Sequence, residues 1–456
     1  MTTSIVPLES LGRVHFIGIG GVGMSAVARI MVARGVPVSG TDAKDLPVMH
    51  DLSAAGARIA VGYDAGNLGD AQTIVAGSAI RADNPELAAA RAAGLPVLHR
   101  SEALAATMAG HRVVTVAGTH GKSTTTSMIA VLLKEAGLDP SFAIGANVPA
   151  LGVNAAHGAS DVFVAEADES DGSFLNYRPL IAVVTNVEAD HLDHYGTPEA
   201  VFASFDNFAA LLPADGVLLA CADDAGARAL AERTAGKGTT RVLTYGTAGD
   251  ADIRLHDDGP AAVAVAIGAQ THTLDLQVPG RHNALNAAAA FAVAVELGVA
   301  PEAAAAALGQ FTGASRRFEL KGQGRGVRVY DDYAHHPTEV RAALSAARSV
   351  AGGRKVHVLF QPHLFSRTRE FATEFAEALA AADTALVLDI YPAREDPVPG
   401  VTSALIADHL TNGRLVPASE AVDAVVAVAG EGDVVLTVGA GDVTAYGPAI
   451  VGALGG

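Results

Sequence analysis

The sequence has a single cysteine and an excess of acidic over basic residues. Cys221 has no partner for an intramolecular disulfide, which excludes a disulfide framework and favours a reducing compartment, so we expect a cytoplasmic protein. The net charge of −18 argues against nonspecific binding to nucleic acid or to anionic membranes. No uncharged apolar run reaches the roughly 18 residues of a membrane span, and Glu9, Arg13 and His15 interrupt the segment where a signal peptide would lie. We therefore expect neither a nucleic-acid nor a membrane partner.

The composition and the pattern of the chain predict a compact enzyme built from several α/β units. The chain has 456 residues, of which half are apolar and 18% are charged, so more than one hydrophobic core is expected. Short β-branched runs alternate with Ala-rich helical stretches up to about residue 107, again from about 111, and again from about 320. Such alternation predicts parallel sheets with helical crossovers. Between 240 and 280 short alternating runs predict a small antiparallel appendage.

The segment Val113–Ser127 (VVTVAGTHGKSTTTS) predicts a phosphate-binding loop between a buried strand and a helix. Such a turn directs backbone N–H groups and a helix N-terminus at one anion, while Lys122 adds a charge and Ser123 or Thr124 can reach a magnesium ion. The spacing departs from the common pattern G-x-x-x-x-G-K-[ST], because Val116 stands where the first glycine is expected and Gly118 comes two residues later. The loop is therefore shorter than in most nucleoside triphosphatases.

A second glycine-rich turn, GIGGVGMS, follows the first predicted strand and contains G-x-G-x-x-G as Gly18, Gly20 and Gly23. Asp42 ends the next predicted strand, where an acidic residue commonly meets a ribose hydroxyl. The pattern predicts a site for a diphosphate or a dinucleotide. It does not decide which, and NAD binding or a turn needed only for packing remain alternatives.

Acidic residues and a histidine follow two later strands of the central unit. Glu166, Asp168, Glu169 and Asp171 lie in EADESDGS, and His191 lies in NVEADHLDHY. Carboxylates at the C-terminal edge of a sheet beside a phosphate loop are typical of sites for hard cations. An acidic surface turn and a solvated histidine are the alternatives.

The third unit places DDYAHHP and FQPHLFSRTRE just after strands, at the edge where α/β proteins bind ligands. Arg367 and Arg369 are suited to a carboxylate or a phosphate. Arg316 and Arg317 lie in a predicted linker, Gly313–Arg317, where a solvated hinge is equally consistent with the sequence.

Taken together, these motifs resemble the Mur ligases, the ATP-dependent amide-forming enzymes of peptidoglycan synthesis. The resemblance covers essentially the whole chain, through GIGGVGMS, AGTHGKSTTT, EADESDGSF, TNVEADHLDHY, GRHNALNA, RRFE, DDYAHHPTE and FQPHLFSRT. It implies three α/β domains: an N-terminal Rossmann-like domain (1–107) for a UDP-sugar, a central phosphate-loop domain of ATPase type (108–318), and a C-terminal Rossmann-like domain (319–456) for the amino acid. The motifs are most similar to the branch that adds L-alanine to UDP-N-acetylmuramate through an acyl phosphate.

The resemblance also implies roles for individual residues. The UDP-sugar would lie against Gly18, Gly20, Gly21 and Gly23, with Asp42, Ser78 and His99 nearby. ATP would contact Gly118, Thr119, His120, Gly121, Lys122, Ser123 and Thr124, and also Asn283, Asn286, Arg317 and Asp331. Ser123 and Glu166 would hold one Mg²⁺, Glu166 and His191 a second, and Lys122, Glu166 and His191 would form the catalytic group. His335 and Arg367 would face the amino acid.

Two departures and three alternatives accompany this interpretation. Leu364 stands where many members have an arginine, so recognition of the amino-acid carboxylate would depend more on Arg367. The sequence has no lysine between Lys134 and Lys237, so the carbamylated lysine of several sister ligases is not expected. The alternatives are a recycling ligase that uses an intact tripeptide, an NAD-dependent oxidoreductase, and a non-catalytic nucleotide-binding regulator. A monomer or a weak homodimer is expected.

Overall fold

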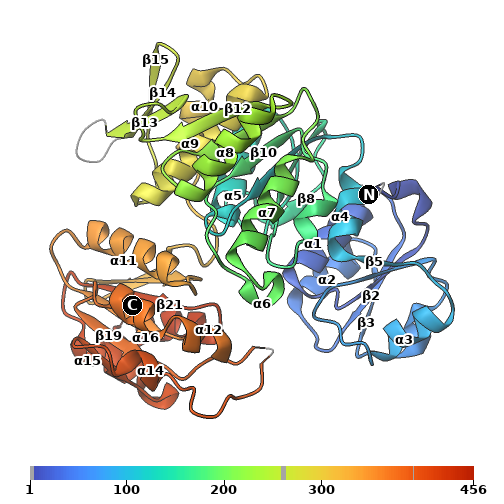
Figure 1. The fold of residues 1–456 in the computed structure, drawn as a ribbon. Coiled ribbons are helices and arrows are strands. Elements are labelled where there is room, and N and C mark those ends of the chain that lie inside the picture. Colours follow the sequence, from blue (N-terminus) through green and yellow to red (C-terminus); the bar gives the residue numbers. More distant parts are fainter. Residues whose placement is uncertain (1–4, 258–262, 394, 456) are drawn as a thin grey trace. The chain divides into compact units, whose positions relative to one another are not determined.

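The computed structural model describes residues 5–257, 263–393 and 395–455 (Figure 1). Contacts divide the chain into two compact units, each described by itself below. The first comprises Met1–Leu276 with Leu285–Thr312, and the second comprises Gln277–Ala284 with Gly313–Gly456. The second long segment begins at Gly313, where the sequence predicted a linker.

The first unit begins with a five-stranded parallel sheet in the order β3-β2-β1-β4-β5. Its strands are β1 (Val14–Ile17), β2 (Val38–Asp42), β3 (Arg58–Val61), β4 (Thr73–Ala76) and β5 (Val97–His99). The helices are α1 (Val22–Ala33), α2 (Pro47–Ala54), α3 (Pro85–Ala92) and α4 (Arg100–Met108). The predicted parallel sheet is confirmed, except that β3 was missed. That edge strand has no fully buried residue, so it lacks the apolar run by which a strand is recognised.

The larger sheet of this unit has ten strands in the order β15-β14-β13-β12-β11-β10-β6-β9-β7-β8. They are β6 (Arg112–Ala117), β7 (Ser141–Ala143), β8 (Ala155–Ala156), β9 (Val162–Glu166), β10 (Ile181–Val184), β11 (Val217–Cys221), β12 (Arg241–Gly246), β13 (Ile253–Asp257), β14 (Val263–Ile267) and β15 (Gln270–Leu274). Strand β6 lies between β9 and β10 and is parallel to both, so the segments that follow these three strands meet at one edge. The predicted antiparallel strands are confirmed as β13–β15, which extend this sheet.

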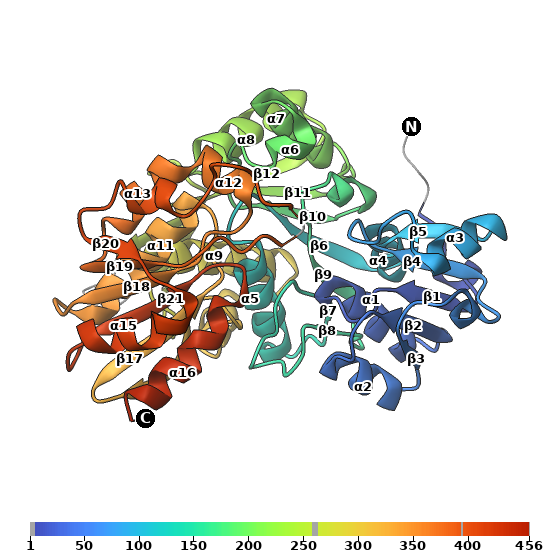
Figure 2. The same ribbon diagram turned by 90° about the horizontal axis from the view of Figure 1, so that it is seen from below.

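Helices flank this sheet, and both ribbon views show α1 of the smaller sheet beside β8 (Figures 1 and 2). The helices are α5 (Lys122–Glu135), α6 (Leu192–Tyr195), α7 (Pro198–Ala209), α8 (Ala225–Lys237), α9 (Arg281–Glu296), which belongs to this unit from Leu285 onward, and α10 (Pro301–Leu308). Every residue of α5 from Thr125 to Leu133 is buried, so the helix that follows the phosphate loop is fixed within the core. The loop therefore starts from a rigid support.

The second unit is a six-stranded sheet in the order β16-β17-β21-β18-β19-β20. Its strands are β16 (Glu319–Gly324), β17 (Val327–Asp332), β18 (Val356–Phe360), β19 (Thr384–Val387), β20 (Gly413–Leu415) and β21 (Val434–Val438). Only β16 is antiparallel to its neighbour. The helices are α11 (Pro337–Ala351), α12 (Phe365–Glu370), α13 (Ala372–Leu379), α14 (Ala404–Ala407), α15 (Ala421–Val428) and α16 (Tyr446–Ala453). Apolar clusters cover both faces, as a parallel sheet requires.

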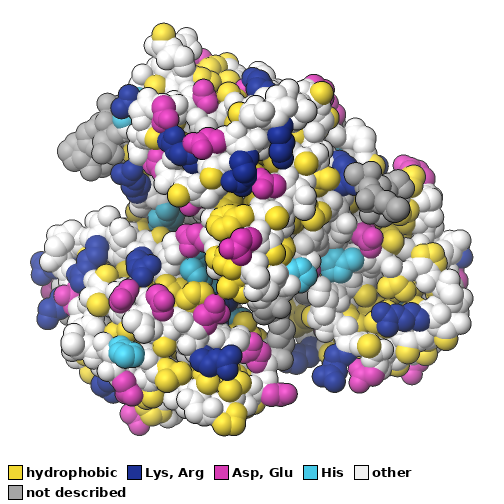
Figure 3. Space-filling view, in the orientation of Figure 1, with side chains coloured by type: hydrophobic (Ala, Val, Ile, Leu, Met, Phe, Trp, Pro, Cys, Tyr) yellow, Lys and Arg dark blue, Asp and Glu magenta, His cyan; other side chains and the backbone are white. Residues whose placement is uncertain are grey.

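Three α/β sheets thus account for the described chain, in agreement with the predicted fold class. Acidic and basic side chains are interspersed over the face in view in Figure 3. Among the described residues, no helix is both long and apolar enough to span a membrane.

Candidate active site

The loop after β6 is held in place by the segment that follows β10. The backbone N–H of Thr119 donates to the carbonyl of Asn186 at 3.2 Å, and that of His120 donates to the Asn186 side chain at 2.7 Å. The hydroxyl of Thr185 donates to the carbonyl of His120 at 2.6 Å. Gly121 has φ +82° and is the N-cap of α5 without a side-chain cap hydrogen bond, so the loop leads into a helix N-terminus, the kind of position at which proteins commonly bind anions. The loop therefore has the conformation that a phosphate site requires.

Lys122 makes three hydrogen bonds within this site. Its ammonium donates to the carbonyls of Gly118 at 2.7 Å and Thr119 at 3.2 Å, and to Glu169 Oε1 at 2.9 Å. Burial alone would lower the pKa of Lys122, but the negative charges of Glu169, Asp168 and Glu166 raise it above its usual value. Lys122 is therefore a fixed cation in the loop.

Ser123 and Glu166 lie together, as predicted. The hydroxyl of Ser123 is 2.9 and 3.1 Å from the two carboxylate oxygens of Glu166, and the backbone N–H of Gly145 donates to Glu166 Oε2 at 2.9 Å. A hydroxyl and a carboxylate at the base of a phosphate loop are the oxygen ligands that Mg²⁺ prefers. These two residues fit the magnesium site that the sequence predicts, and the half-buried Thr124 follows them in the first turn of α5.

Glu169 lies between Lys122 and His191. Its Oε1 is 2.9 Å from Lys122 Nζ and 3.9 Å from His191 Nε2, and the carboxylate is almost wholly buried. Burial raises the pKa of Glu169 to about 7, against the opposing charge of Lys122. His191 has φ +56° and also lies 3.6 Å from Asp190. The sequence placed Glu169 in the acidic cluster without giving it a role, and the structure makes it the anionic partner of the loop lysine.

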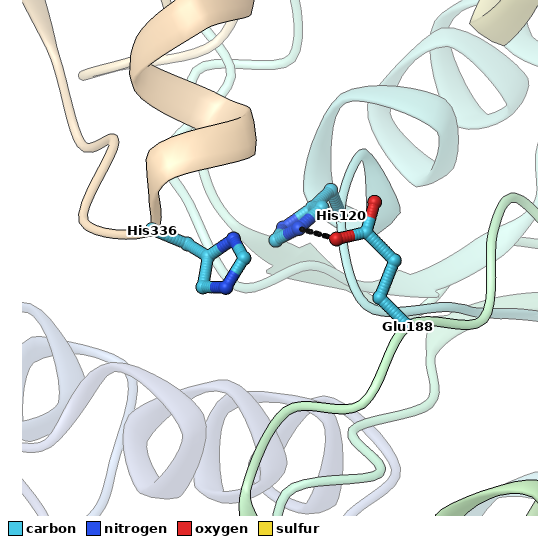
Figure 4. A group of neighbouring side chains, drawn as sticks. All are labelled: His120, Glu188 and His336. Atoms are coloured by element: carbon cyan, nitrogen blue, oxygen red, sulfur yellow. Dashed lines mark ion pairs between the residues drawn. The ribbon is translucent and has the colours of Figure 1, made fainter. Parts of the chain in front are cut away.

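The side chain of His120 extends from the loop toward Glu188, with 3.6 Å between Nε2 and the carboxylate (Figure 4). Glu188 belongs to the segment after β10, and its backbone N–H donates to the hydroxyl of Thr119 at 2.9 Å. His336, also drawn in Figure 4, belongs to the second unit, where it caps α11 and accepts from the Thr338 N–H. Of the two asparagines predicted for the nucleotide, Asn286 lies against Gly121 and Asn283 donates to the carbonyl of Pro279.

The glycine turn after β1 is tied to the end of β2. The backbone N–H of Gly18 donates to Thr41, and that of Gly20 donates to Asp42 Oδ2 at 3.0 Å. A Cβ on Gly20 would lie 2.4 Å from Leu46, and one on Gly23 would lie 3.0 Å from Arg100. Gly21 is the N-cap of α1. The turn lies beside β4, at the point where the strand order reverses, which is the ordinary ligand position of such sheets.

Ser78 follows β4 and His99 ends β5, and both side chains lie near Asp171 in the acidic loop after β9. Ser78 Oγ is 3.1 Å from His99 Nε2 and 3.1 Å from Asp171 Oδ2. His99 Nδ1 is 2.7 Å from Ser101 Oγ, which accepts from Asn176 at 2.8 Å. Of the residues predicted for the UDP-sugar, Ser78 is therefore hydrogen-bonded to the loop that carries Glu169 and Asp171, and His99 Nε2 lies 3.8 Å from Asp171 in the same loop.

In the second unit, Asp331 near the end of β17 is fully buried and takes part in several hydrogen bonds and an ion pair. Its carboxylate accepts from Thr437 at 2.7 Å and Thr444 at 2.8 Å, and it pairs with Arg316 at 3.3 Å. Arg316 also donates to the carbonyl of Gly439 at 2.6 Å. Asp331 thus links the predicted linker to the loop after β21.

Arg317 lies over the Tyr333 ring, with 5.1 Å between its guanidinium carbon and the ring centroid. Burial raises the pKa of Asp332 to about 6 against the charge of Arg317. His335 Nδ1 lies 3.0 Å from the carbonyl oxygen of Tyr333 and 3.3 Å from a carboxylate oxygen of Glu339. Burial lowers the pKa of His335 to about 4, and the charge of Arg367 acts in the same direction. His335 is therefore neutral near pH 7.

Arg367 lies in the last turn of α12, whose N-cap is Leu364 at φ +71°. The structure thus places His335 and Arg367 after β17 and β18, the two neighbours of β21.

Sequence reasoning missed several residues that shape these sites. Thr185 and Asn186 hold the phosphate loop, Arg100 packs on the glycine turn, and Arg316 rather than Arg317 pairs with Asp331. The sequence signals for Thr185 and Asn186 were their place at the end of a buried strand and at the start of the motif TNVEADHLDHY, in which no role was predicted for these two residues.

Comparison with known proteins shows which family this chain represents. Three family models match it: "Mur ligase family, catalytic domain" over residues 13–112, "Mur ligase middle domain" over 116–294, and "Mur ligase, glutamate ligase domain" over 316–441. The UDP-N-acetylmuramate–L-alanine ligase of Paenarthrobacter aurescens (strain TC1) is 89% identical over 456 residues, and the alignment covers all of both chains. The chain belongs to the Mur ligase family.

Other relatives agree with this assignment. The UDP-N-acetylmuramate–L-alanine ligase of Renibacterium salmoninarum is 64% identical, with 98% of this chain and 97% of the relative covered. The crystal structure of UDP-N-acetylmuramate–alanine ligase from Thermotoga maritima superposes with a TM-score of 0.79 at 29% identity, covering 97% of this chain and 98% of that one. A murein peptide ligase from Psychrobacter arcticus gives a TM-score of 0.72 at 25% identity, covering 97% and 99%. This Mur ligase therefore shares its three-domain α/β fold and family with enzymes of peptidoglycan precursor synthesis.

Proposed function

We propose that this Mur ligase joins L-alanine to UDP-N-acetylmuramate in an amide bond, with conversion of ATP to ADP and inorganic phosphate. The observation that carries the proposal is the arrangement at the ends of β6, β9 and β10. There Lys122 and Ser123 lie in a phosphate loop that Thr185 and Asn186 hold by hydrogen bonds, and Glu166 lies within hydrogen-bond distance of Ser123. The full-length likeness to L-alanine ligases supports the substrate pair.

The chemistry follows from these groups. The carboxylate oxygen of the muramate attacks the γ-phosphorus of ATP, the bond to ADP breaks, and an acyl phosphate forms. The amine of L-alanine, after losing a proton, attacks the acyl carbon, and inorganic phosphate leaves as the amide forms. Lys122 stabilises the charge on the transferring group, because positioning and electrostatics supply most of the catalysis of phosphoryl transfer.

We propose that Ser123 and Glu166 hold one Mg²⁺, and that Glu166 and His191 hold a second. Mg²⁺, when bound, would neutralise charge on the phosphates. The contact between Ser123 and Glu166 supports the first site, and the position of His191 beside Glu169 supports a cation in the same region.

The remaining predicted residues, with the exception of Asp331, keep the roles that the resemblance implies. The glycine turn, with Asp42, Ser78 and His99, binds the UDP-sugar; His335 and Arg367 face L-alanine; and Asn283, Asn286 and Arg317 complete the nucleotide site. Because Asp331 is buried and already accepts three interactions, we propose that it positions Arg316 and the loop after β21 rather than touching ATP. We also propose the domain limits 1–107, 108–318 and 319–456, a cytoplasmic location, which the use of ATP supports, and a monomer or weak homodimer.

The decisive experiment measures phosphate release with ATP, Mg²⁺ and UDP-N-acetylmuramate while L-alanine, glycine, L-serine or the tripeptide is added in turn. We expect release that depends on L-alanine. The absence of any amine-dependent release would refute the ligase activity, and a preference for the tripeptide would instead support the recycling ligase. In Lys122→Ala, turnover should be lost while UDP-sugar binding, measured by calorimetry, stays near the wild-type value. An equal loss of both would refute the separate assignment of the two sites.

A further inference from the structure

The ammonium group of Lys122 has no spare donor in this structure. A lysine has three N–H groups, and those of Lys122 meet the carbonyls of Gly118 and Thr119 and the carboxylate of Glu169. A nucleotide phosphate that binds Lys122 must therefore displace at least one of these partners. The identity of the displaced partner determines which contact of Lys122 is lost when the phosphate binds.

Glu169 is the partner that an arriving phosphate disfavours most. The two carbonyls belong to the loop that surrounds the phosphates and carry no net charge, whereas Glu169 is a carboxyl group buried to 1% exposure and paired with the Lys122 ammonium at 2.9 Å. Two anions that share one cation a few ångströms apart repel each other, and burial strengthens that repulsion because the local dielectric is low.

Glu169 is also less firmly held than the neighbouring carboxylate of Glu166. Both oxygens of Glu166 lie within hydrogen-bond distance of Ser123, and one also accepts from the Gly145 N–H. By contrast, the buried Oε2 of Glu169 has no hydrogen-bond partner among the described residues. The Glu169 carboxylate is thus held through one oxygen, by Lys122, with His191 at 3.9 Å from the same oxygen.

We propose that Glu169 is a competing counter-ion, which occupies Lys122 in the nucleotide-free loop and is displaced by the nucleotide phosphate. This inference rests on the proposed function, because it takes Lys122 as a phosphate-binding residue. Glu169 acts through Lys122 and is a positioning residue. It stabilises the empty loop and lowers the affinity for nucleotide.

The test compares the binding of ADP to the full-length wild type, Glu169→Gln and Asp161→Asn by calorimetry, with and without Mg²⁺. Glutamine keeps an acceptor for Lys122 but removes the charge. Asp161→Asn is the matched control, since it removes one negative charge at the other end of β9, where Asp161 pairs with Arg112 at the surface.

We expect Glu169→Gln to bind ADP roughly tenfold more tightly, the ratio that corresponds to losing a charged hydrogen bond as competitor, and Asp161→Asn to bind as wild type does. Thermal unfolding without nucleotide should show a lower Tm for Glu169→Gln, and ADP should raise it by more than in wild type. A simple structural role would lower the Tm without tightening the binding.

Binding by Glu169→Gln that is equal to or weaker than wild type would overturn the inference. Weakening only in the presence of Mg²⁺ would also overturn it and would identify Glu169 as a metal ligand. If Glu169→Gln does not fold, Glu169→Asp, which retracts the carboxylate from Lys122, decides the matter by the same criterion. If the wild type binds neither ADP nor ATP, the proposed function fails, whereas failure of the inference alone leaves wild-type binding intact.

Discussion

The substitution Gly118→Ala tests whether the close contact between the phosphate loop and the segment after β10 stabilises the site. Gly118 has φ +132°, a conformation that L-residues rarely adopt, so alanine there costs about 1–3 kcal/mol in backbone strain. Its Cβ would lie 2.1 Å from Thr185 Oγ1 and within 2.9–3.0 Å of the backbone of Asn186. Overpacking of this kind costs about 1–3 kcal/mol more.

The total loss of unfolding free energy is therefore expected to be about 2–6 kcal/mol, measured by calorimetry of the full-length chain. Gly137→Ala is the matched control. Gly137 follows the other end of α5 at φ +87° with no atom within 4 Å of a Cβ, so it carries the strain without the collision. The difference between the two variants isolates the steric cost, which should be roughly 1–3 kcal/mol.

A double variant sharpens the test. Thr185→Ala removes the hydroxyl at 2.1 Å, so Gly118→Ala combined with Thr185→Ala should be less destabilised than the sum of the single variants. ADP binding should fall in Gly118→Ala and stay near wild type in Gly137→Ala. Equal destabilisation by Gly118→Ala and Gly137→Ala, or strict additivity with Thr185→Ala, would refute the reasoning.

Three further predictions concern the other sites. Glu86 is fully buried and accepts a hydrogen bond from Thr41 at 2.6 Å, and its pKa is lowered because its hydrogen bonds, that of His15 first, outweigh the effect of burial. Glu86→Gln should therefore lower the free energy of unfolding by about 2–4 kcal/mol above pH 4.5, and this loss should shrink as the pH falls through the lowered pKa. Urea unfolding followed by circular dichroism measures the loss, and a loss that grows on acidification would contradict this prediction. For Asp332 the pH dependence of stability runs the other way, because burial raises its pKa to about 6. The stability that it contributes is complete below its unfolded pKa of 3.8 and is lost as the pH rises through 6. The free energy of unfolding of Asp332→Asn should therefore rise by up to about 3 kcal/mol relative to wild type between pH 4 and 7, and a difference that does not change with pH would refute the prediction. His99→Ala should raise the KM for UDP-N-acetylmuramate at least several-fold, in steady-state assays, while the KM for ATP changes little; a selective effect on ATP would show that His99 acts through Asp171 instead.

Much of the fold could be predicted from the sequence because its signals are local. The buried strands of the parallel sheets are short β-branched runs, and glycine turns with positive φ end β1 and β6, where the chain turns into a helix. Strands such as β3 and β20 escaped prediction because they lie at sheet edges and bury little apolar surface.

The sequence by itself determined the phosphate loop, since Gly118, Gly121, Lys122 and Ser123 are neighbours in the chain and their local geometry follows from their own chemistry. Tertiary structure alone decided which acid meets Lys122, because Glu166, Asp168 and Glu169 are equivalent candidates in a sequence of four residues. The order β10-β6-β9 brings Glu169 to the lysine and Thr185 with Asn186 to the loop, through contacts between residues 47 to 66 positions apart in the sequence. Strand order depends on long-range packing, which no local pattern encodes, and it is this order that turns three separate motifs into one site.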